Sequence, residues 1–336
     1  MKPVLVVGHG LAGAILAQSL LMRGIMVHCV DAGIKHSASS VAAGLINPFI
    51  GPKLNIPEQF NECIKANLLF FQKWEVEAGE KLFHSEHLLR VFTSQKQVSK
   101  WMELSESSDY ALSFLDEEKL DKCGISGKWG AGKTKAYRLH IQRFLSLSKE
   151  KLISMNCWQS VDDVDLKDKS VSAIIFAEGF NVIENPFFNW LPFAPAQGEI
   201  LELGGPVLPS ASNGTWLIPS ADSNYLTGST WKHSDLKSGP TIKGKEEIFR
   251  NLNFVPIEMF KEINHFSGIR SGTKDRNPIL GKHPKHKNLF IFNGFGSRGS
   301  TTIMLNANRL INLLELEIEL PEKVSLRRFM EYYKGT

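Results

Sequence analysis

The sequence predicts an α/β fold that carries a second domain built on a mixed, largely antiparallel sheet (α+β). Three observations predict it. Residues 1–31 alternate a β-branched run, a glycine-rich turn, a helical pattern and a second apolar run. Residues 190–232 are instead rich in Pro, Gly, Trp and alternating apolar residues, a composition typical of antiparallel strands. Residues 266–315 return to the order strand, glycine turn, helix, so two α/β segments enclose the sheet-rich middle of the chain.

The composition is that of an ordinary globular protein. The chain has 336 residues, enough for one large or two modest domains, with 43% hydrophobic and 22% charged residues. Its net charge of +4 is mild and does not by itself indicate nucleic-acid binding. Four scattered cysteines without a C-x-x-C pair indicate reduced thiols, and we expect a cytoplasmic protein.

The N-terminus imitates a signal peptide or a membrane anchor. Lys2 precedes a mostly apolar stretch that extends to Met22. Three glycines and His9 interrupt this stretch, so a strand followed by a helix explains it better. No later segment has the length that a membrane helix needs, and we therefore expect no membrane partner.

The first glycine-rich turn has the pattern of a Rossmann-like dinucleotide site. Gly8 allows the tight turn out of the strand, Gly10 lets backbone approach a pyrophosphate, and Gly13 lets the following helix pack against the sheet. The helix N-terminus offers N–H groups to the phosphates. Asp31, 18 residues after Gly13, suits the hydroxyls of an adenosine ribose. The alternative is a purely structural glycine turn. The predicted contacts at this end are Gly8, Gly10, Leu11, Ala12, Gly13, Asp31 and Ala32.

The elements between the two α/β segments follow from periodicity. Residues 35–55 form a loop of small residues that lets backbone N–H groups approach a ligand. The helical patterns are those of residues 58–78, 103–120 and 137–153, and the strands are those of residues 171–177, 217–219 and 225–231. The C-terminal α/β segment comprises a strand at 288–292, a turn at 293–299 and a helix at 302–314.

The turn at 293–299 repeats the first one far along the chain. Gly294, Gly296 and Gly299 again precede a helix, so a second helix N-terminus is available. A chain with two such elements can hold both ends of a long ligand such as FAD, with the second turn near the flavin. The alternative is an ordinary capped surface helix.

Arg270 is the candidate for binding a substrate. It is flanked by small residues in a strand-like segment, and its planar guanidinium suits a carboxylate. The alternative is an arginine paired with a structural acid. Other chemistries lack their motifs, because the chain has no Gly-x-Ser-x-Gly elbow and no Walker A loop. His283 and His286 have no third ligand nearby, so we predict no metal site.

These pieces in this order resemble a known family. The motifs are Gly8-x-Gly10-x-x-Gly13 with Asp31, Ser39-Ser-Val-Ala-Ala-Gly44, Phe176-Ala-Glu-Gly179, Ala196-Gln-Gly-Glu199, Gly268 to Gly281 around Arg270, and the final glycine turn. The chain resembles the D-amino acid oxidase, glycine oxidase and sarcosine oxidase superfamily of FAD-dependent amine oxidases. Within it, Gly294-Phe-Gly-Ser-Arg-Gly299 is most similar to the oxidase half of the bifunctional tRNA 5-methylaminomethyl-2-thiouridine biosynthesis protein.

The resemblance implies a discontinuous FAD-binding domain of residues 1–78, 131–185 and 266–336, and a substrate domain of residues 79–130 and 186–265. It implies that Arg270 binds a substrate carboxylate and that Val161 offers its backbone to adenine. The further implied cofactor contacts are Ser39, Ser40, Ala43, Gly44, Ala177, Gly179, Gly294, Gly296, Ser297, Arg298 and Gly299. Some members of the resembled family attach the flavin covalently, through a cysteine in the C-terminal half or a histidine just before the Ala-Ala-Gly. Here no cysteine follows Cys157 and Val41 precedes Ala42-Ala43-Gly44, so the resemblance implies that FAD is held non-covalently.

The implied reaction is the oxidation of a primary or secondary amine that bears a carboxylate, such as glycine or an N-substituted glycine. Hydride transfer to flavin N5 gives an imine that water hydrolyses, and oxygen or another acceptor reoxidises the flavin. No side-chain base is evident, and a neutral amine needs none. Tyr225 and Trp231 are candidates for the pocket wall, with Tyr225 as a catalytic candidate, and core packing is their alternative. The alternative functions are a dehydrogenase with another acceptor and a tRNA wobble-uridine oxidase acting on a carboxymethylaminomethyl group.

Overall fold

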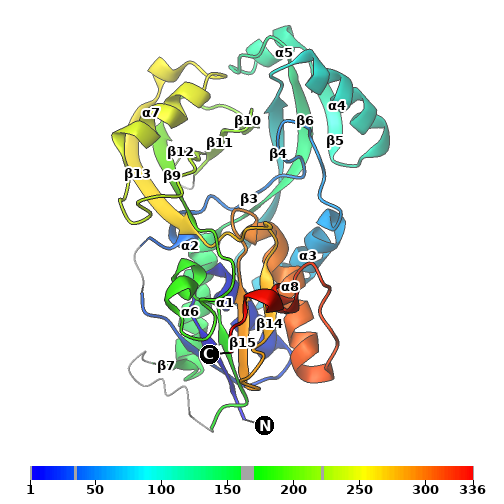
Figure 1. Ribbon diagram of the computed structural model, residues 1–336. Helices are drawn as coiled ribbons and strands as arrows, with labels where there is room; N and C mark the ends of the chain where they lie inside the picture. Colours follow the sequence, from blue (N-terminus) through cyan, green and yellow to red (C-terminus); the bar gives the residue numbers. More distant parts are fainter. Residues whose placement is uncertain (1, 34–35, 160–169, 221–222, 336) are drawn as a thin grey trace.

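The computed structural model describes residues 2–33, 36–159, 170–220 and 223–335. Two sheets organise it, one of six strands in the lower half of Figure 1 and one of nine strands in the upper half. This arrangement confirms the predicted α/β fold with a second mixed sheet.

The six-stranded sheet begins with the predicted strand–helix–strand unit. Strand β1 (Val4–Val7) is followed by helix α1 (Leu11–Met22) and strand β2 (Val27–Val30), and β1 pairs in parallel with β2. Strand β8 (Ala173–Phe176) joins β1 on its other side, also in parallel. These strands are short, apolar and rich in β-branched residues because both faces of the sheet are covered.

The remaining strands and helices extend this unit. Strand β7 (Trp158–Gln159) pairs with β2, β15 (Leu289–Asn293) pairs in parallel with β8, and β14 (Ile279–Lys282) closes the sheet antiparallel to β15. Helix α8 (Gly299–Leu316) packs against α1 and against α3 (Phe60–Ala78), and α6 (Ile141–Ser154) packs against α1. The 3-10 helices are η2 (Gly179–Glu184), η3 (Ile257–Met259) and η4 (Leu326–Tyr332).

The nine-stranded sheet is mixed and mostly antiparallel. Only the pair β10–β4 is parallel among its described ladders. Its order is β13 (Lys261–Arg270), β9 (Ala196–Gly204), β12 (Tyr225–Gly228), β11 (Trp216–Pro219), β10 (Ala211–Ser212), β4 (Phe83–Val91), β6 (Ala131–Leu139) and β3 (Leu45–Ile46), with β5 (Ala111–Leu115) on β6. Helix α7 (Ile242–Asn251) lies over one end of this sheet, and helices α4 (Gln95–Ser107) and α5 (Glu117–Asp121) lie at the other (Figure 1).

Three predicted elements differ from the structure. The charged pattern at 103–120 is not one helix, because strand β5 separates α4 from α5. Pairing with β6 outweighs the helical preference of these residues, and the Asp116 side chain starts α5 by accepting from Lys119 N at 2.9 Å. The predicted helix at 137–153 begins two residues after β6 ends, at Ile141, and the predicted strand at 225–231 ends at Gly228.

The strands cross the predicted domain boundaries. Strand β6 and the end of β13 pair within the nine-stranded sheet. The family resemblance implies instead that residues 131–185 and 266–336 belong to the FAD-binding domain. Strand pairing alone does not decide how the chain divides into domains, so the domain limits stay a prediction. Strand β13 runs from the nine-stranded sheet toward the six-stranded sheet (Figure 1). None of the helices in the described part of the chain combines the length and the apolar character that a membrane crossing requires.

Candidate functional site

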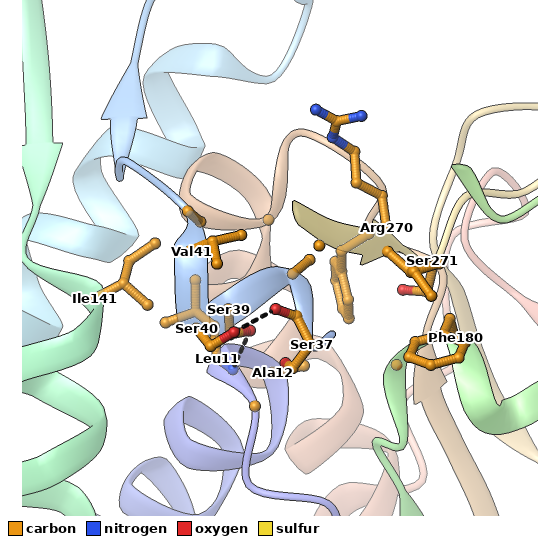
Figure 2. Close-up of a pocket in the computed structure, with 18 of the residues that line it drawn as sticks. Leu11, Ala12, Ser37, Ser39, Ser40, Val41, Ile141, Phe180, Arg270 and Ser271 are labelled. Carbon is orange, nitrogen blue, oxygen red and sulfur yellow. Dashed lines mark hydrogen bonds between the residues drawn. The ribbon is translucent and has the colours of Figure 1, made fainter. Parts of the chain in front are cut away.

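A cavity of about 550 Å³ is lined by residues of both sheets. It extends from the turn between β1 and α1, past the short helix α2 (Ala38–Val41), to the end of β13 and the start of α8. Figure 2 shows Leu11, Ala12 and Ser39 at one side of this lining and Arg270 at another, with its guanidinium directed away from them. The cavity therefore gathers segments that are far apart in the sequence.

Glycines bring backbone close together at the start of α1. Gly8 has φ +101°, and a Cβ on it would lie 2.6 Å from the carbonyl oxygen of Ala177. A Cβ on Gly13 would lie 1.8 Å from the carbonyl oxygen of Gly8. Gly10 gives the helix no side-chain cap, and Ser39 Oγ accepts a hydrogen bond from Leu11 N at 2.9 Å. The turn thus presents backbone and a hydroxyl to the cavity, which fits a phosphate group.

Asp31 is held in a fixed orientation where β2 ends. Its Oδ2 accepts from His9 N at 2.5 Å and its Oδ1 accepts from Gly33 N at 2.7 Å. Asp31 also lines the cavity, together with Ala32. A carboxylate fixed at the end of the second parallel strand fits the ribose of a bound dinucleotide.

His9 belongs to a buried polar cluster behind the glycine turn. Its Nε2 lies 3.1 Å from Ser148 Oγ, which also accepts from Gln18 Nε2 at 3.0 Å. Trp74 Nε1 donates to Gln18 Oε1 at 3.3 Å. Burial lowers the pKa of His9 to about 4, against the opposing effect of Asp31. The imidazole is therefore neutral at pH 7.

We expect His9 to make the stability of the protein depend on pH. The unfolded chain binds a proton at His9 below about pH 6.5, whereas the folded chain resists it down to about pH 4. The free energy of unfolding therefore falls as the pH drops from 6.5 to 4, by about 3 kcal/mol from this group. Urea titrations at pH 7 and pH 4.5 measure the loss. In His9→Gln the difference between the two pH values shrinks, while the exposed His233→Gln leaves it unchanged; equal losses in both variants and wild type would contradict the assignment.

The segment from Ser37 to Gly44 lines the middle of the cavity. Gly44 has φ +72°, and a Cβ on it would lie 1.9 Å from the carbonyl oxygen of Leu139. Helix α2 rests on β13, where a Cβ on Gly268 would lie 2.7 Å from Val41 Cγ2. Ile269 N also donates to the carbonyl of His36 at 2.8 Å. Small residues thus let this segment pass between the sheets at close range.

The C-terminal glycine turn has two parts with different positions. Gly296, Ser297 and Gly299 line the cavity at the start of α8. Gly294 does not line it, and a Cβ there would lie 2.7 Å from Thr273 Cγ2. Arg298, the N-cap residue of α8, donates from Nη2 to the carbonyl of Arg276 at 2.9 Å. Gly294 and Arg298 therefore shape the turn, whereas the other three residues face the cavity.

Arg270 is the last residue of β13, and its charged side chain lines the cavity. Its Nη2 donates to Ser229 Oγ at 2.6 Å and its Nη1 donates to the carbonyl of Thr230 at 3.1 Å. The Trp231 ring lies 4.3 Å from the guanidinium carbon. A Cβ on Gly198 would lie 2.1 Å from Nη2, so a larger residue there would displace the guanidinium from this position.

No carboxylate of the described residues forms an ion pair with Arg270. Burial alone lowers the pKa of Arg270 to about 10, which still leaves it charged at neutral pH. The alternative of an arginine paired with a structural acid therefore fails for the described residues. A buried positive charge without a counter-ion is costly, and an anionic ligand in the cavity would neutralise it.

Most of the residues predicted for the site meet in this cavity. Those that line it are Gly8, Gly10, Leu11, Ala12, Asp31, Ala32, Ser39, Ser40, Ala43, Gly44, Ala177, Gly179, Arg270, Gly296, Ser297 and Gly299. Gly13, Gly294 and Arg298 support the two turns without lining it. Val161 lies outside the described residues.

Sequence reasoning missed several residues that line the cavity: His9, Ser37, Glu178, Phe180, Gly198, Trp216, Ser229 and Ser271. His9, Glu178, Gly198 and Ser271 lie within the sequence motifs, beside residues that were predicted to contact the cofactor or the substrate. Glu178 is one of them; burial raises the pKa of its carboxyl group, and Asn185 Nδ2 donates to it at 2.7 Å. Ser229 had no local signal, because its place depends on the pairing of β12 with β9.

Tyr225 is a core residue and does not line the cavity, contrary to the expectation of a pocket or catalytic role. Its ring packs in a hydrophobic cluster that the nine-stranded sheet forms with Ile248 of α7. Its hydroxyl accepts from Leu208 N at 2.5 Å and donates to the carbonyl of Leu208 at 3.0 Å. Side chains alternate along a strand, so Tyr225 faces away from the side on which Gly228 and Ile200 meet.

Tyr225→Phe should therefore lower stability and spare catalysis. The change leaves the backbone groups of Leu208 without their shared partner, and we expect a loss of about 1–3 kcal/mol in the free energy of unfolding. Thermal and urea denaturation measure it, with Tyr110→Phe as control, because the Tyr110 hydroxyl bonds to Asn61 at an exposed place. A fall in kcat/KM without a loss of stability would restore the catalytic role.

Comparison with known proteins adds independent findings. Residues 3–139 and 151–313 match the family model described as "FAD dependent oxidoreductase" (DAO). A glycine oxidase from Pseudomonas putida is 21% identical over 330 residues, covering 86% of this chain and 88% of the relative. The bifunctional tRNA 5-methylaminomethyl-2-thiouridine biosynthesis protein of Marinobacter nauticus is 23% identical over 88% of this chain, which spans only 53% of that relative.

A solved structure with the same fold is that of an iminodiacetate oxidase from Chelativorans sp. BNC1. It superposes with a TM-score of 0.76 at 18% identity, and the match covers 96% of this chain and 99% of the other. At this identity the likeness concerns the fold alone.

Proposed function

The chain belongs to the DAO family of FAD-dependent oxidoreductases, and from this premise we propose that it oxidises a primary or secondary amine that bears a carboxylate. The family, the enzyme class and the FAD dependence agree with the sequence expectations. The observation that carries the substrate proposal is the half-buried, charged Arg270 at one end of the cavity, without a carboxylate partner among the described residues. The substrate type is glycine or an N-substituted glycine.

The glycines that line the cavity and the carboxylate of Asp31 fit the adenosine diphosphate part of FAD. Gly8 and Gly10 would let the pyrophosphate approach α1, and Asp31 would hold the ribose. The residues from Ser39 to Gly44 and from Gly296 to Gly299 would border the flavin. Bound FAD supplies an acceptor for the two electrons and the hydrogen of a substrate C–H bond. We propose that it is held without a covalent bond.

Arg270 binds and orients the substrate in this proposal. Its guanidinium offers paired N–H donors whose geometry matches the two oxygens of a carboxylate. Fixing the carboxylate fixes the adjacent carbon and its nitrogen, which converts a bimolecular encounter into an oriented one. Trp216 and Ile200 bring apolar surface to the same cavity.

The chain itself supplies no evident base for the reaction. Ionisable side chains among the described lining residues are those of His9, Asp31, Glu178 and Arg270. His9 and Asp31 lie at the glycine turn of α1. A substrate amine that binds in its neutral form needs no proton acceptor, because its lone pair assists the departure of the hydride. Departure of the hydride leaves a protonated imine (iminium), which water then hydrolyses to the carbonyl product and a protonated amine.

The relatives support the same class of substrate. Glycine and iminodiacetate, in the names of two similar proteins, are both amines that carry a carboxymethyl group. The similarity to the tRNA biosynthesis protein supports a second candidate, an oxidase that acts on a carboxymethylaminomethyl group of a wobble uridine. The electron acceptor would be oxygen or, in a dehydrogenase, another carrier. The four cysteines are free thiols, which suits the cytoplasm that we propose as its location.

Anaerobic bleaching of the flavin absorbance tests the proposal. The FAD-loaded protein is mixed with glycine, sarcosine and iminodiacetate, and with the methyl ester of each. We expect bleaching by at least one free acid and little by its ester. Salt-sensitive tRNA binding, with bleaching only by the modified tRNA, would favour the second candidate. Equal bleaching by acids and esters, or by none of the panel, would exclude a carboxylate-directed amine oxidase of this type.

A further inference from the structure

Ser229 lies beside Arg270 in the cavity lining. Strand β12 ends at Gly228, which pairs with Ile200 of β9, and Ser229 is the next residue. Its hydroxyl oxygen accepts from Arg270 Nη2 at 2.6 Å. Both residues line the cavity, so the hydroxyl and the guanidinium meet the same space.

The hydroxyl of Ser229 keeps its own proton for another partner. A serine hydroxyl has one hydrogen to donate and two lone pairs that accept. The contact with Arg270 uses a lone pair, because guanidinium nitrogens only donate. Within the described part of the chain, no acceptor for the Ser229 hydroxyl proton is found at hydrogen-bond distance. The proton is thus available to a ligand in the cavity.

The guanidinium also keeps donors for a ligand. Two of its five N–H donors are used by Ser229 Oγ and by the Thr230 carbonyl. The Trp231 ring covers it at 4.3 Å, and Gly198 leaves the space that it occupies. Enough N–H groups remain for both oxygens of a carboxylate. The Ser229 hydroxyl therefore adds one more hydrogen-bond donor beside the Arg270 guanidinium, which itself only donates.

We propose that Ser229 Oγ donates a hydrogen bond to the same substrate carboxylate that Arg270 binds, so that the two residues form one carboxylate site. This inference rests on the proposed function. The N–H groups of Arg270 and the O–H group of Ser229 offer donors, and both oxygens of a carboxylate accept. This site selects a carboxylate over an amide, whose NH₂ group would face other donors, and over an ester, which lacks the charge. Ser229 is thus a substrate-binding residue, and the hydroxyl beside Arg270 is not that of Tyr225, which bonds to Leu208.

Equilibrium binding of acetate to the FAD-loaded protein tests the inference without turnover. Acetate carries the carboxylate and no amine, and the change in the flavin absorbance spectrum reports its dissociation constant. We expect Ser229→Ala to weaken acetate binding about tenfold, as loss of one hydrogen bond to a charged group predicts. Ser229→Thr keeps the hydroxyl and should stay within about twofold of the wild type.

Two comparisons separate a binding role from a structural one. Acetamide, which is neutral, should lose less affinity than acetate in Ser229→Ala. Ser212→Ala removes another buried hydroxyl of the same sheet, outside the cavity, and should bind acetate as the wild type does. If Ser229→Ala does not retain FAD, Ser229→Cys gives the same comparison, since a thiol donates only weakly.

The outcomes distinguish this inference from the proposed function. Unchanged acetate affinity in Ser229→Ala, with a large loss in Arg270→Ala, overturns the role of Ser229 and leaves the carboxylate proposal standing. An equal loss of acetate and acetamide affinity in Ser229→Ala also overturns it, since that is the result of a distorted pocket. Acetate binding that neither Ser229→Ala nor Arg270→Ala changes would overturn both.

Discussion

Arg270→Ala should lower kcat/KM for carboxylate-bearing amines on the order of 10³-fold. Removing one member of a buried, hydrogen-bonded charge pair costs about 2–5 kcal/mol, and the substrate carboxylate would then be buried without its partner. Arg270→Lys keeps the charge but loses the planar fork, so we expect it to recover only a small part of the loss. Anaerobic stopped-flow measurement of flavin reduction gives both values.

The same experiment contains its own control. An amine without a carboxylate makes no use of the guanidinium, so its slow oxidation should change little between the wild type and the two variants. The FAD content should also stay the same, because Arg270 contacts Ser229, Thr230 and Trp231, which follow strand β12 of the nine-stranded sheet. A parallel loss with both kinds of amine would mean that Arg270 acts on the fold of the cavity and does not bind the carboxylate.

Gly13→Ala should have the second largest effect, on stability and on cofactor retention together. Alanine favours a helix over glycine by about 1 kcal/mol, so propensity alone predicts a gain. The new Cβ would however lie 1.8 Å from the carbonyl oxygen of Gly8, and a backbone atom cannot rotate away. We expect a net loss of about 3 kcal/mol in stability and about 100-fold weaker FAD binding, since the Gly8 turn must move.

Denaturation in the presence and absence of added FAD, and titration of the apoprotein with FAD, measure the two effects. Ser19→Ala is the matched control in the same helix, because Ser19 is buried and its hydroxyl donates to the carbonyl of Ile15 within α1, the one hydrogen bond of this side chain among the residues that the structure describes. That variant should keep its FAD affinity. A Gly13→Ala protein as stable as the wild type would show that the helix can shift away from the turn without cost.

The glycine turn and Asp31 could be predicted because their chemistry is local. A tight turn, a helix start and a carboxylate at the end of the second strand follow from spacing within 31 residues. Arg270 could be predicted from the small residues around it. The structure explains one of these small residues, because Gly268 leaves space for the side chain of Val41. A second glycine, Gly198, is far from Arg270 in the sequence and leaves space for its guanidinium.

The substrate end could not be predicted in the same way, because it depends on which face of a strand meets the cavity. Tyr225 and Gly228 stand on opposite faces of β12, and nothing in the residues from Tyr225 to Trp231 tells which face is inward. The pairing of Gly228 with Ile200 decides it. Likewise, the sequence of β5 has a helical pattern, and its strand conformation depends on pairing with β6, which the local sequence does not show.

In the proposed complex, Arg270 and Ser229 contact only the carboxylate of the substrate, so these contacts would outlast the reaction at the neighbouring carbon. Oxidation of a glycine-type amine at the carbon next to the carboxylate leaves that group intact, so the oxo acid formed presents the same anion to the same donors. Under this proposal the site would hold the product as well as the substrate. Competitive inhibition by the accumulated oxo acid follows from a site that recognises the unreacting end of the molecule.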